Sequence, residues 1–121
     1  MKTGRKVTGG RYKKAKKKKL YERVGHTRLV KLGKEKRKFL RVRGGSRKYI
    51  LLSTDKANVY DTSVKKSEVV KIKAVLETPS NRFLARKKII TKGTIIETEK
   101  GKARITNRPS QEGSVQAILL K

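Results

Sequence analysis

Six of the seven residues from Lys13 to Lys19 are lysine, and only Ala15 interrupts the row. In a helix, pairs such as Lys13 and Lys17 would bring like charges together four residues apart, which is destabilising. The apolar residues nearby scatter around a helical wheel and form no common face. We therefore expect Arg11–Glu22 to be disordered in isolation, and to become helical only when phosphates of a binding partner neutralise its charge.

The positive charge of the chain is concentrated at its N-terminal end. Residues 1–48 contain 21 Lys or Arg and two acidic residues, net +19, whereas residues 49–121 contribute only +8 of the total of +27. Such a charge repels itself in a compact monomer and attracts any phosphate-rich surface. Nucleic acid is therefore the first candidate partner, and we do not expect self-association.

The composition excludes several classes of protein. A length of 121 residues with 34% hydrophobic content indicates one domain with a small core and an extension. The absence of cysteine excludes disulfides and thiolate chemistry, and fits a reducing compartment. The longest apolar runs, Tyr49–Leu52 and Ala117–Leu120, are too short for a signal peptide or a membrane span. We expect a soluble, cytoplasmic protein with no membrane partner.

The composition changes near Gly33–Arg37, where a polar, basic and glycine-bearing segment gives way to short apolar runs separated by turn residues. We predict two parts: residues 1–35 as a basic RNA-binding extension, and residues 36–121 as a β-barrel domain.

The second part has the alternation that is typical of strands. In Glu68–Leu76, for example, Val70, Ile72, Ala74 and Leu76 fall on one side. Up to eight strands are predicted, at Phe39–Arg43, Lys48–Ser53, Ala57–Tyr60, Glu68–Leu76, Lys88–Ile90, Thr94–Thr98, Lys102–Thr106 and Ser114–Leu120. Many short strands with brief connections indicate an all-β fold, a small closed or partly open barrel of about six to eight strands.

Turn residues separate these strands, at Gly44-Gly45-Ser46, Asp61-Thr62-Ser63, Thr91-Lys92-Gly93, Glu99-Lys100-Gly101 and Pro109–Gly113. Gly44-Gly45 and Lys100-Gly101 are typical of hairpin turns that need a positive φ. The stretch Pro79–Arg86 interrupts the alternation, and we predict one helical turn there that begins at Pro79 after Thr78 as its cap.

Three features favour RNA as the partner. Arg43-Gly44-Gly45 resembles one unit of an RGG segment, and Tyr12 and Tyr21 lie inside the basic run, where a ring can stack on an exposed base. Packing of either tyrosine against the barrel is the alternative interpretation. A second basic cluster interrupts the strands and is interpreted as an RNA contact rather than a solvated loop: Asn81, Arg82, Arg86, Lys87 and Lys88.

Gly4 and Gly9 have the spacing of a phosphate-binding loop. However, Gly10 and Arg11 occupy the positions where that motif needs Lys and then Ser or Thr, and no strand precedes them. We interpret these glycines as flexible points that let the backbone approach a phosphate.

An enzymatic or metal site is not indicated. His26 is the only histidine, which excludes multi-histidine metal clusters, and a Ser-His-Asp arrangement would require it to enter a folded pocket from a basic arm. Glu97 and Glu99 share one strand face, but balance of the neighbouring lysines explains them more simply than a metal. We predict no catalysis, cofactor or metal.

Many short motifs, in order along nearly the whole chain, resemble one known family, the archaeal and eukaryotic type of small-subunit ribosomal protein eight. The chain lacks the long insertion of eukaryotic members and is similar to the archaeal ones. These motifs are Thr8-Gly9-Gly10, Lys18-Lys19-Leu20-Tyr21-Glu22, Thr27-Arg28-Leu29 leading to Gly33, Val42-Arg43-Gly44-Gly45-Ser46, Ala57-Asn58-Val59-Tyr60-Asp61, Pro79-Ser80-Asn81, Ile89-Ile90-Thr91-Lys92-Gly93 and Gly101 to Pro109.

The resemblance implies a structural protein of the small ribosomal subunit in the cytoplasm, with a barrel seated on ribosomal RNA and an extension threading between RNA helices. It implies ribosomal RNA and neighbouring small-subunit proteins as partners, a monomer within the ribosome, and no small-molecule substrate. Thr78 and Arg82 depart from residues that related chains often carry around this loop.

We hypothesise that cations replace the counterions of RNA phosphates and let RNA helices approach one another. The predicted RNA-binding residues are Lys2, Arg5, Lys6, Gly9, Gly10, Arg11, Tyr12, Lys13, Lys14, Lys16, Lys17, Lys18, Lys19, Tyr21, Arg23, His26, Arg28, Lys31, Lys36, Arg37, Lys38, Arg41, Arg43, Gly44, Gly45, Arg47, Lys48, Asn81, Arg82, Arg86, Lys87 and Lys88. A ribosome assembly factor and a general nucleic-acid-compacting protein are the alternative interpretations.

Overall fold

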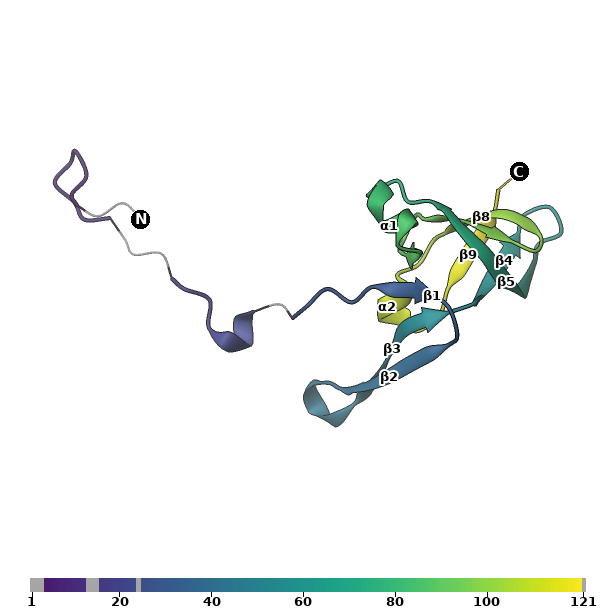
Figure 1. Cartoon of the computed structure of the whole chain (residues 1–121). Coiled ribbons are helices and arrows are strands. Elements are labelled where there is room, and N and C mark those ends of the chain that lie inside the picture. Colours follow the sequence, from purple (N-terminus) through teal and green to yellow (C-terminus); the bar gives the residue numbers. More distant parts are fainter. Residues whose placement is uncertain (1–3, 13–15, 24, 121) are drawn as a thin grey trace.

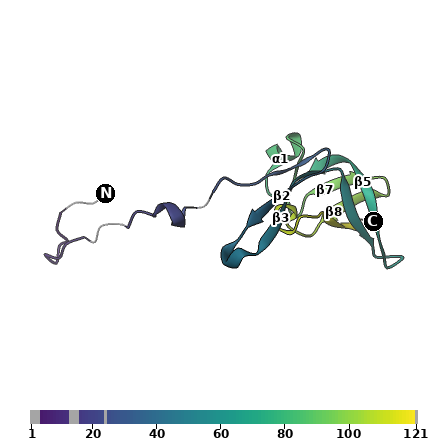
Figure 2. The ribbon, with the colours of Figure 1, turned by 90° about the horizontal axis from the view of Figure 1, so that it is seen from below.

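The computed structural model describes residues 4–12, 16–23 and 25–120, which form an extended N-terminal arm and a folded β body (Figure 1). The arm reaches away from the body, and the view from below shows the same arrangement (Figure 2). The body consists of a four-stranded sheet and a closed barrel.

The four-stranded sheet has the order β2-β3-β1-β6. Its strands are β1 (Val30–Leu32), β2 (Lys36–Arg41), β3 (Arg47–Thr54) and β6 (Ile89–Ile90). Strand β1 runs parallel to β3 and antiparallel to β6. The sequence did not predict β1, which lies inside the range assigned to the extension and has Val30 only 1% exposed. The chain therefore enters the folded body at Val30.

The barrel closes through five strands in the order β4-β5-β7-β8-β9. These strands are β4 (Lys56–Asp61), β5 (Lys66–Glu77), β7 (Ile95–Thr98), β8 (Gly101–Ile105) and β9 (Gln116–Leu119). Parallel pairing of β4 with β9 closes the ring, and the other neighbours pair antiparallel. The prediction of an all-β fold built on a small barrel is confirmed, with part of the predicted strands forming the separate sheet.

One aliphatic core joins the sheet to the barrel. Val30, Leu51 and Ile90 of the sheet belong to the same buried cluster as the inward-facing barrel residues Ala57, Val59, Val70, Ile72, Ile96, Ala103, Ile105, Val115 and Ala117. No aromatic ring takes part, because all six Tyr and Phe residues of the chain are at least 37% exposed.

The alternation predicted along β5 holds only in its first half. Val70 and Ile72 are buried as expected, but Leu76 is 41% exposed. The pairing of β5 with β7 shifts register after Ile72 and again after Val75, and each shift turns the following side chains to the other face. The prediction that Leu76 shares the inner face was therefore wrong.

Two predicted hairpin turns are confirmed. Gly44 and Gly45 both have φ of 83° between the antiparallel strands β2 and β3, in a 3₁₀ turn over Arg43–Gly45. Gly101 has φ of 122° where β7 returns as β8. Only glycine adopts these conformations without strain.

The helix α1 (Arg82–Arg86) is the predicted helical turn, but its cap was assigned wrongly. Asn81 is the N-cap, because its Oδ1 accepts a hydrogen bond from the Phe83 N–H at 2.9 Å. Thr78 is instead buried, and its hydroxyl lies 3.4 Å from that of Thr94.

A second short helix, α2 (Pro109–Glu112), occupies a segment that the sequence indicated only as a turn. Gly113 ends α2 in the left-handed conformation, with φ of 75°. Helix α2 packs against β3, and Lys48 Nζ donates to Gln111 Oε1 at 2.6 Å. Both helices are far too short to cross a bilayer, and the described residues contain no other α-helix.

Candidate nucleic-acid interface

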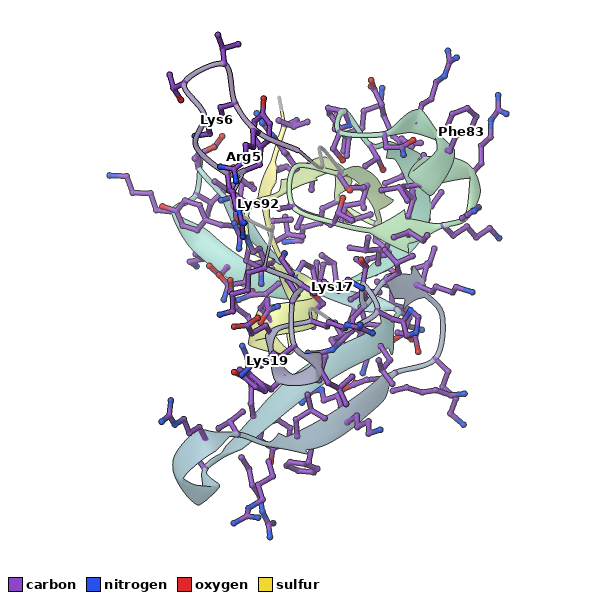
Figure 3. The ribbon with its side chains drawn as sticks, turned by 90° about the vertical axis from the view of Figure 1, so that its left-hand side faces the viewer. Arg5, Lys6, Lys17, Lys19, Phe83 and Lys92 are labelled. Carbon is purple, nitrogen blue, oxygen red and sulfur yellow. The ribbon has the colours of Figure 1, made fainter. Side chains whose placement is uncertain are left out.

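The first described part of the arm is a tight loop rich in cations. Arg5 and Arg11 form an isolated antiparallel bridge, and the Lys6 N–H donates to the Gly10 carbonyl at 2.7 Å. Arg5 Nη1 also donates to the carbonyl of Gly9, which has φ of 78°. Gly9 and Gly10 therefore shape a closed turn that presents Arg5, Lys6 and Arg11 together; the first two are labelled in Figure 3.

Of the lysine row, Lys16–Lys19 are exposed and non-helical, and a single 3₁₀ turn follows them at Leu20–Glu22. Glu22 organises this turn, since it accepts the Lys19 N–H at 3.0 Å and Lys16 Nζ at 3.2 Å. Lys17, Lys18 and Lys19 are exposed. The RNA-dependent helix over Arg11–Glu22 stays a prediction, and Lys2, Lys13 and Lys14 lie outside the described residues.

Both arm tyrosines are outside the barrel core. Tyr12 is 40% exposed with Lys6 Nζ at 5.9 Å from its ring centroid, and Tyr21 is 77% exposed with Lys19 Nζ at 5.8 Å. These distances fit cation–π contacts. The rings are thus available to a base, and their predicted stacking remains a proposal.

Arg23 and residues 25–28 are exposed, and the chain leads from them into β1. His26 and Arg28 line a shallow depression together with Ser110 and Gln111 of α2. This arrangement brings the last part of the arm beside the helix that packs on β3. Lys31, on β1 itself, is also exposed.

The β2–β3 hairpin is a second basic element. It projects from the body on the side where the arm emerges, as Figures 1 and 2 both show. Residues 36–54 contain no acid. Arg37 pairs with Glu35 at 2.5 Å, and Lys48 contacts Gln111. All seven cations predicted for this element are exposed: Lys36, Arg37, Lys38, Arg41, Arg43, Arg47 and Lys48.

The third basic element surrounds α1 and contains a residue that the sequence analysis missed. Phe83 is 54% exposed, and the guanidinium carbons of Arg82 and Arg86 lie 5.6 and 5.8 Å from its ring centroid. Figure 3 shows Phe83 projecting from the outer surface of α1. An aromatic residue flanked by arginines at i−1 and i+3 was the available signal. Asn81, which was predicted to contact RNA, caps this helix.

Lys88 and Lys65 are the described non-glycine residues with positive φ, at 53° and 55°. Glycine at either position should relieve a backbone strain of about 1–2 kcal/mol, but the greater conformational entropy of glycine in the unfolded chain offsets part of this. The free energy of unfolding, measured by urea denaturation, should therefore rise by about 0.5 kcal/mol. We expect only Lys88→Gly to lower RNA affinity, by about fivefold at low salt, because only Lys88 belongs to the basic cluster. Equal RNA affinities for the two variants would contradict a role for Lys88.

The structure therefore distributes the predicted cations over three exposed elements, the arm, the β2–β3 hairpin and α1, and does not gather them into one pocket. Within residues 4–12, 16–23 and 25–120, no three His, Asp or Glu side chains come together as a metal site would require. Such a distribution suits a large anionic surface better than a small ligand.

The model of the family described as ribosomal protein S8e matches residues 1–120. Three curated archaeal relatives are each named small ribosomal subunit protein eS8. The protein from Sulfolobus acidocaldarius is 45% identical over 97% of this chain and 92% of its own length. Those from Methanocella arvoryzae and Nanoarchaeum equitans are 40% and 42% identical, over 98% and 95% of this chain and 95% and 91% of their own lengths.

Proposed function

The chain belongs to the ribosomal protein S8e family, and from this premise we propose that its basic arm and body loops bind and stabilise small-subunit ribosomal RNA. The protein is a structural constituent of the small ribosomal subunit in the cytoplasm, not an enzyme. Its partners are ribosomal RNA and neighbouring ribosomal proteins, and it acts as a single copy in each subunit.

The observation that carries this proposal is the exposed run Lys16–Lys19 on an arm that extends from the body (Figure 1). Each lysine or arginine that meets a phosphate releases condensed counterions, and this release drives binding. An extended arm lets these contacts reach several RNA helices at once, which a compact domain of the same charge cannot do. Neutralisation of phosphates on facing helices then allows those helices to pack together.

The folded body supports the proposal by fixing where the arm starts. Val30 is buried between β3 and β6 through the pairing of β1, so the residues before it leave the body at a defined point. We propose that β1 anchors the RNA-binding extension to the barrel domain. The β2–β3 hairpin and α1 then contact the same RNA from the folded side, and recognition depends mainly on RNA shape.

The test is sedimentation of the endogenous protein with ribosomal subunits after a high-salt wash. We expect one copy to remain on each mature small subunit. Loss from mature subunits with retention in precursors would instead assign the protein to assembly, and loss from both would leave a general nucleic-acid binder.

A binding measurement on the purified full chain complements this test. Contacts to about ten phosphates should give log affinity a slope of about −7 to −9 against log salt. Structured small-subunit RNA should also compete better than duplex DNA of equal length. Equal competition by DNA would contradict the proposal.

A further inference from the structure

All six aromatic side chains of this protein are on its surface, and its core is entirely aliphatic. Phe and Tyr normally supply much of the buried area in small cores and interfaces. Their exclusion from this core indicates that the rings serve contacts outside the body. Two of them meet on the β2–β3 hairpin, where they form a defined surface.

Phe39 and Tyr49 lie directly opposite each other in the pairing of β2 with β3. Their ring centroids are 4.1 Å apart with an interplanar angle of 50°, and the residues are 53% and 52% exposed. The two rings therefore form one solvent-facing apolar platform. Packing of α2 against β3 and the hydrogen bond from Lys48 to Gln111 hold the base of this hairpin in place.

The next cross-strand pair on the same face is Arg41 opposite Arg47, because residues two apart on a strand point to the same side. Like charges directly opposite one another destabilise a sheet. No acid in residues 36–54 compensates them. An external anion bound between Arg41 and Arg47 would therefore reduce their repulsion. The arginine pair lies about 6.7 Å along the strand from the two rings.

We propose that these four residues, the aromatic–arginine face, bind an unpaired nucleotide of RNA. The base stacks on the platform of Phe39 and Tyr49, and its phosphate lies between Arg41 and Arg47. One nucleotide spans this separation between its base and its phosphate. The inference rests on the proposed function and deepens it, since the lysines and arginines of the arm contact RNA phosphates whereas this face of the folded body stacks on an extruded base.

Charge complementarity favours RNA over a protein as the occupant. The hairpin offers seven cations around two rings, and of these Arg37 pairs with an acid, Glu35, so an apolar protein surface would leave Arg41 and Arg47 without partners. A duplex would satisfy the arginines but would leave the rings without a partner, because its bases are already stacked. An exposed base with its phosphate satisfies both halves of the face.

The test uses the full chain and a short single-stranded RNA that carries one 2-aminopurine, whose fluorescence falls on stacking, together with a blunt duplex of the same sequence. The variant F39L/Y49L should lose the quenching and bind the single strand about 5- to 100-fold more weakly, with an unchanged salt slope. R41Q/R47Q should lower that slope by about 0.7, because the two arginines share one phosphate. Tyr49→Phe keeps the ring and should behave as wild type.

Tyr60→Leu, on β4 in the other sheet, is the matched control and should change neither affinity nor quenching. Cross-linking of wild-type protein to a 4-thiouridine RNA, read by mass spectrometry, needs no variant and should label the aromatic–arginine face. Cross-links confined to the arm would overturn the proposal.

The remaining outcomes separate this inference from its premise. Wild-type protein that binds the single strand with no quenching would overturn the base-stacking face and leave RNA binding intact. Failure to bind any RNA would overturn the proposed function itself. If F39L/Y49L binds both probes normally but no longer enters ribosomal subunits, the face contacts a protein and the proposal is wrong.

Discussion

Replacing Lys16, Lys17, Lys18 and Lys19 with glutamine is expected to weaken binding to small-subunit ribosomal RNA by about three orders of magnitude at about 0.1 M salt. Each lost phosphate contact removes about 0.7–0.9 from the slope of log affinity against log salt, so four contacts remove about three. The row is exposed and lies outside the folded body, so the stability of the body should not change. Filter binding across a salt series measures both quantities.

The matched control removes the same charge from the barrel. Lys65, Lys66, Lys71 and Lys73 lie in and beside β5, are exposed, and were not predicted to contact RNA. Their replacement with glutamine should change the slope by less than about 1. If both variants lose the same affinity, net charge alone drives binding and the arm has no special role.

The barrel could be predicted from the sequence because its strands are local patterns. Alternation along β4, β8 and the first half of β5 follows from the pleat of a strand, and the glycines at the turns follow from the need for a positive φ. Strand β1 could not be found in this way. Val30–Leu32 has only three residues in a basic segment, and it becomes a strand because β3 and β6 supply its hydrogen-bond partners from far along the chain.

The candidate interface was predictable in its charges and in the two tyrosines of the arm, but not in the aromatic residues of the folded body. Binding of anions by a run of lysines can be predicted from the sequence alone, because it does not depend on how the chain folds. Phe39 and Tyr49, by contrast, form one platform only because the hairpin register places them opposite each other, and a strand pattern alone assigns such residues to the core. Phe83 is likewise exposed because α1, where it contacts β5 and β6, has Leu84 and Ala85 as its partly buried residues, which the sequence pattern alone does not show.

Asn107→Ala is expected to lower the free energy of unfolding by about 3 kcal/mol, the second largest effect that we predict. Asn107 is only 8% exposed, and its Nδ2 donates to the Ser114 carbonyl at 2.8 Å and to Glu112 Oε2 at 3.0 Å. Its Oδ1 accepts the Gln116 N–H at 3.1 Å. Alanine removes all three bonds, each worth about 1 kcal/mol. Urea denaturation measures the loss.

Thr106→Ala is the control for this substitution, because Thr106 is the exposed neighbour and its hydroxyl makes only one long hydrogen bond, at 3.4 Å. It should change stability by no more than about 0.5 kcal/mol. The same Asn107 network closes α2, whose Gln111 contacts Lys48 at the base of the hairpin. Asn107→Ala should therefore also reduce 2-aminopurine quenching by the aromatic–arginine face, whereas Thr106→Ala should not.

The pH dependence of Asn107→Ala identifies which bond is lost. The Asn107 side chain, followed by the Arg108 N–H, holds the pKa of the Glu112 carboxyl below its ordinary value. A lowered folded-state pKa adds stability that is fully present above the ordinary pKa and disappears as the pH falls through the folded value. In Asn107→Ala the pKa of Glu112 should return toward its ordinary value. The difference in the free energy of unfolding between this variant and wild type should therefore become smaller at acidic pH. A difference that stays constant between neutral and acidic pH would show that the Glu112 carboxylate contributes nothing to it, and that Asn107 acts only through the backbone of Ser114 and Gln116.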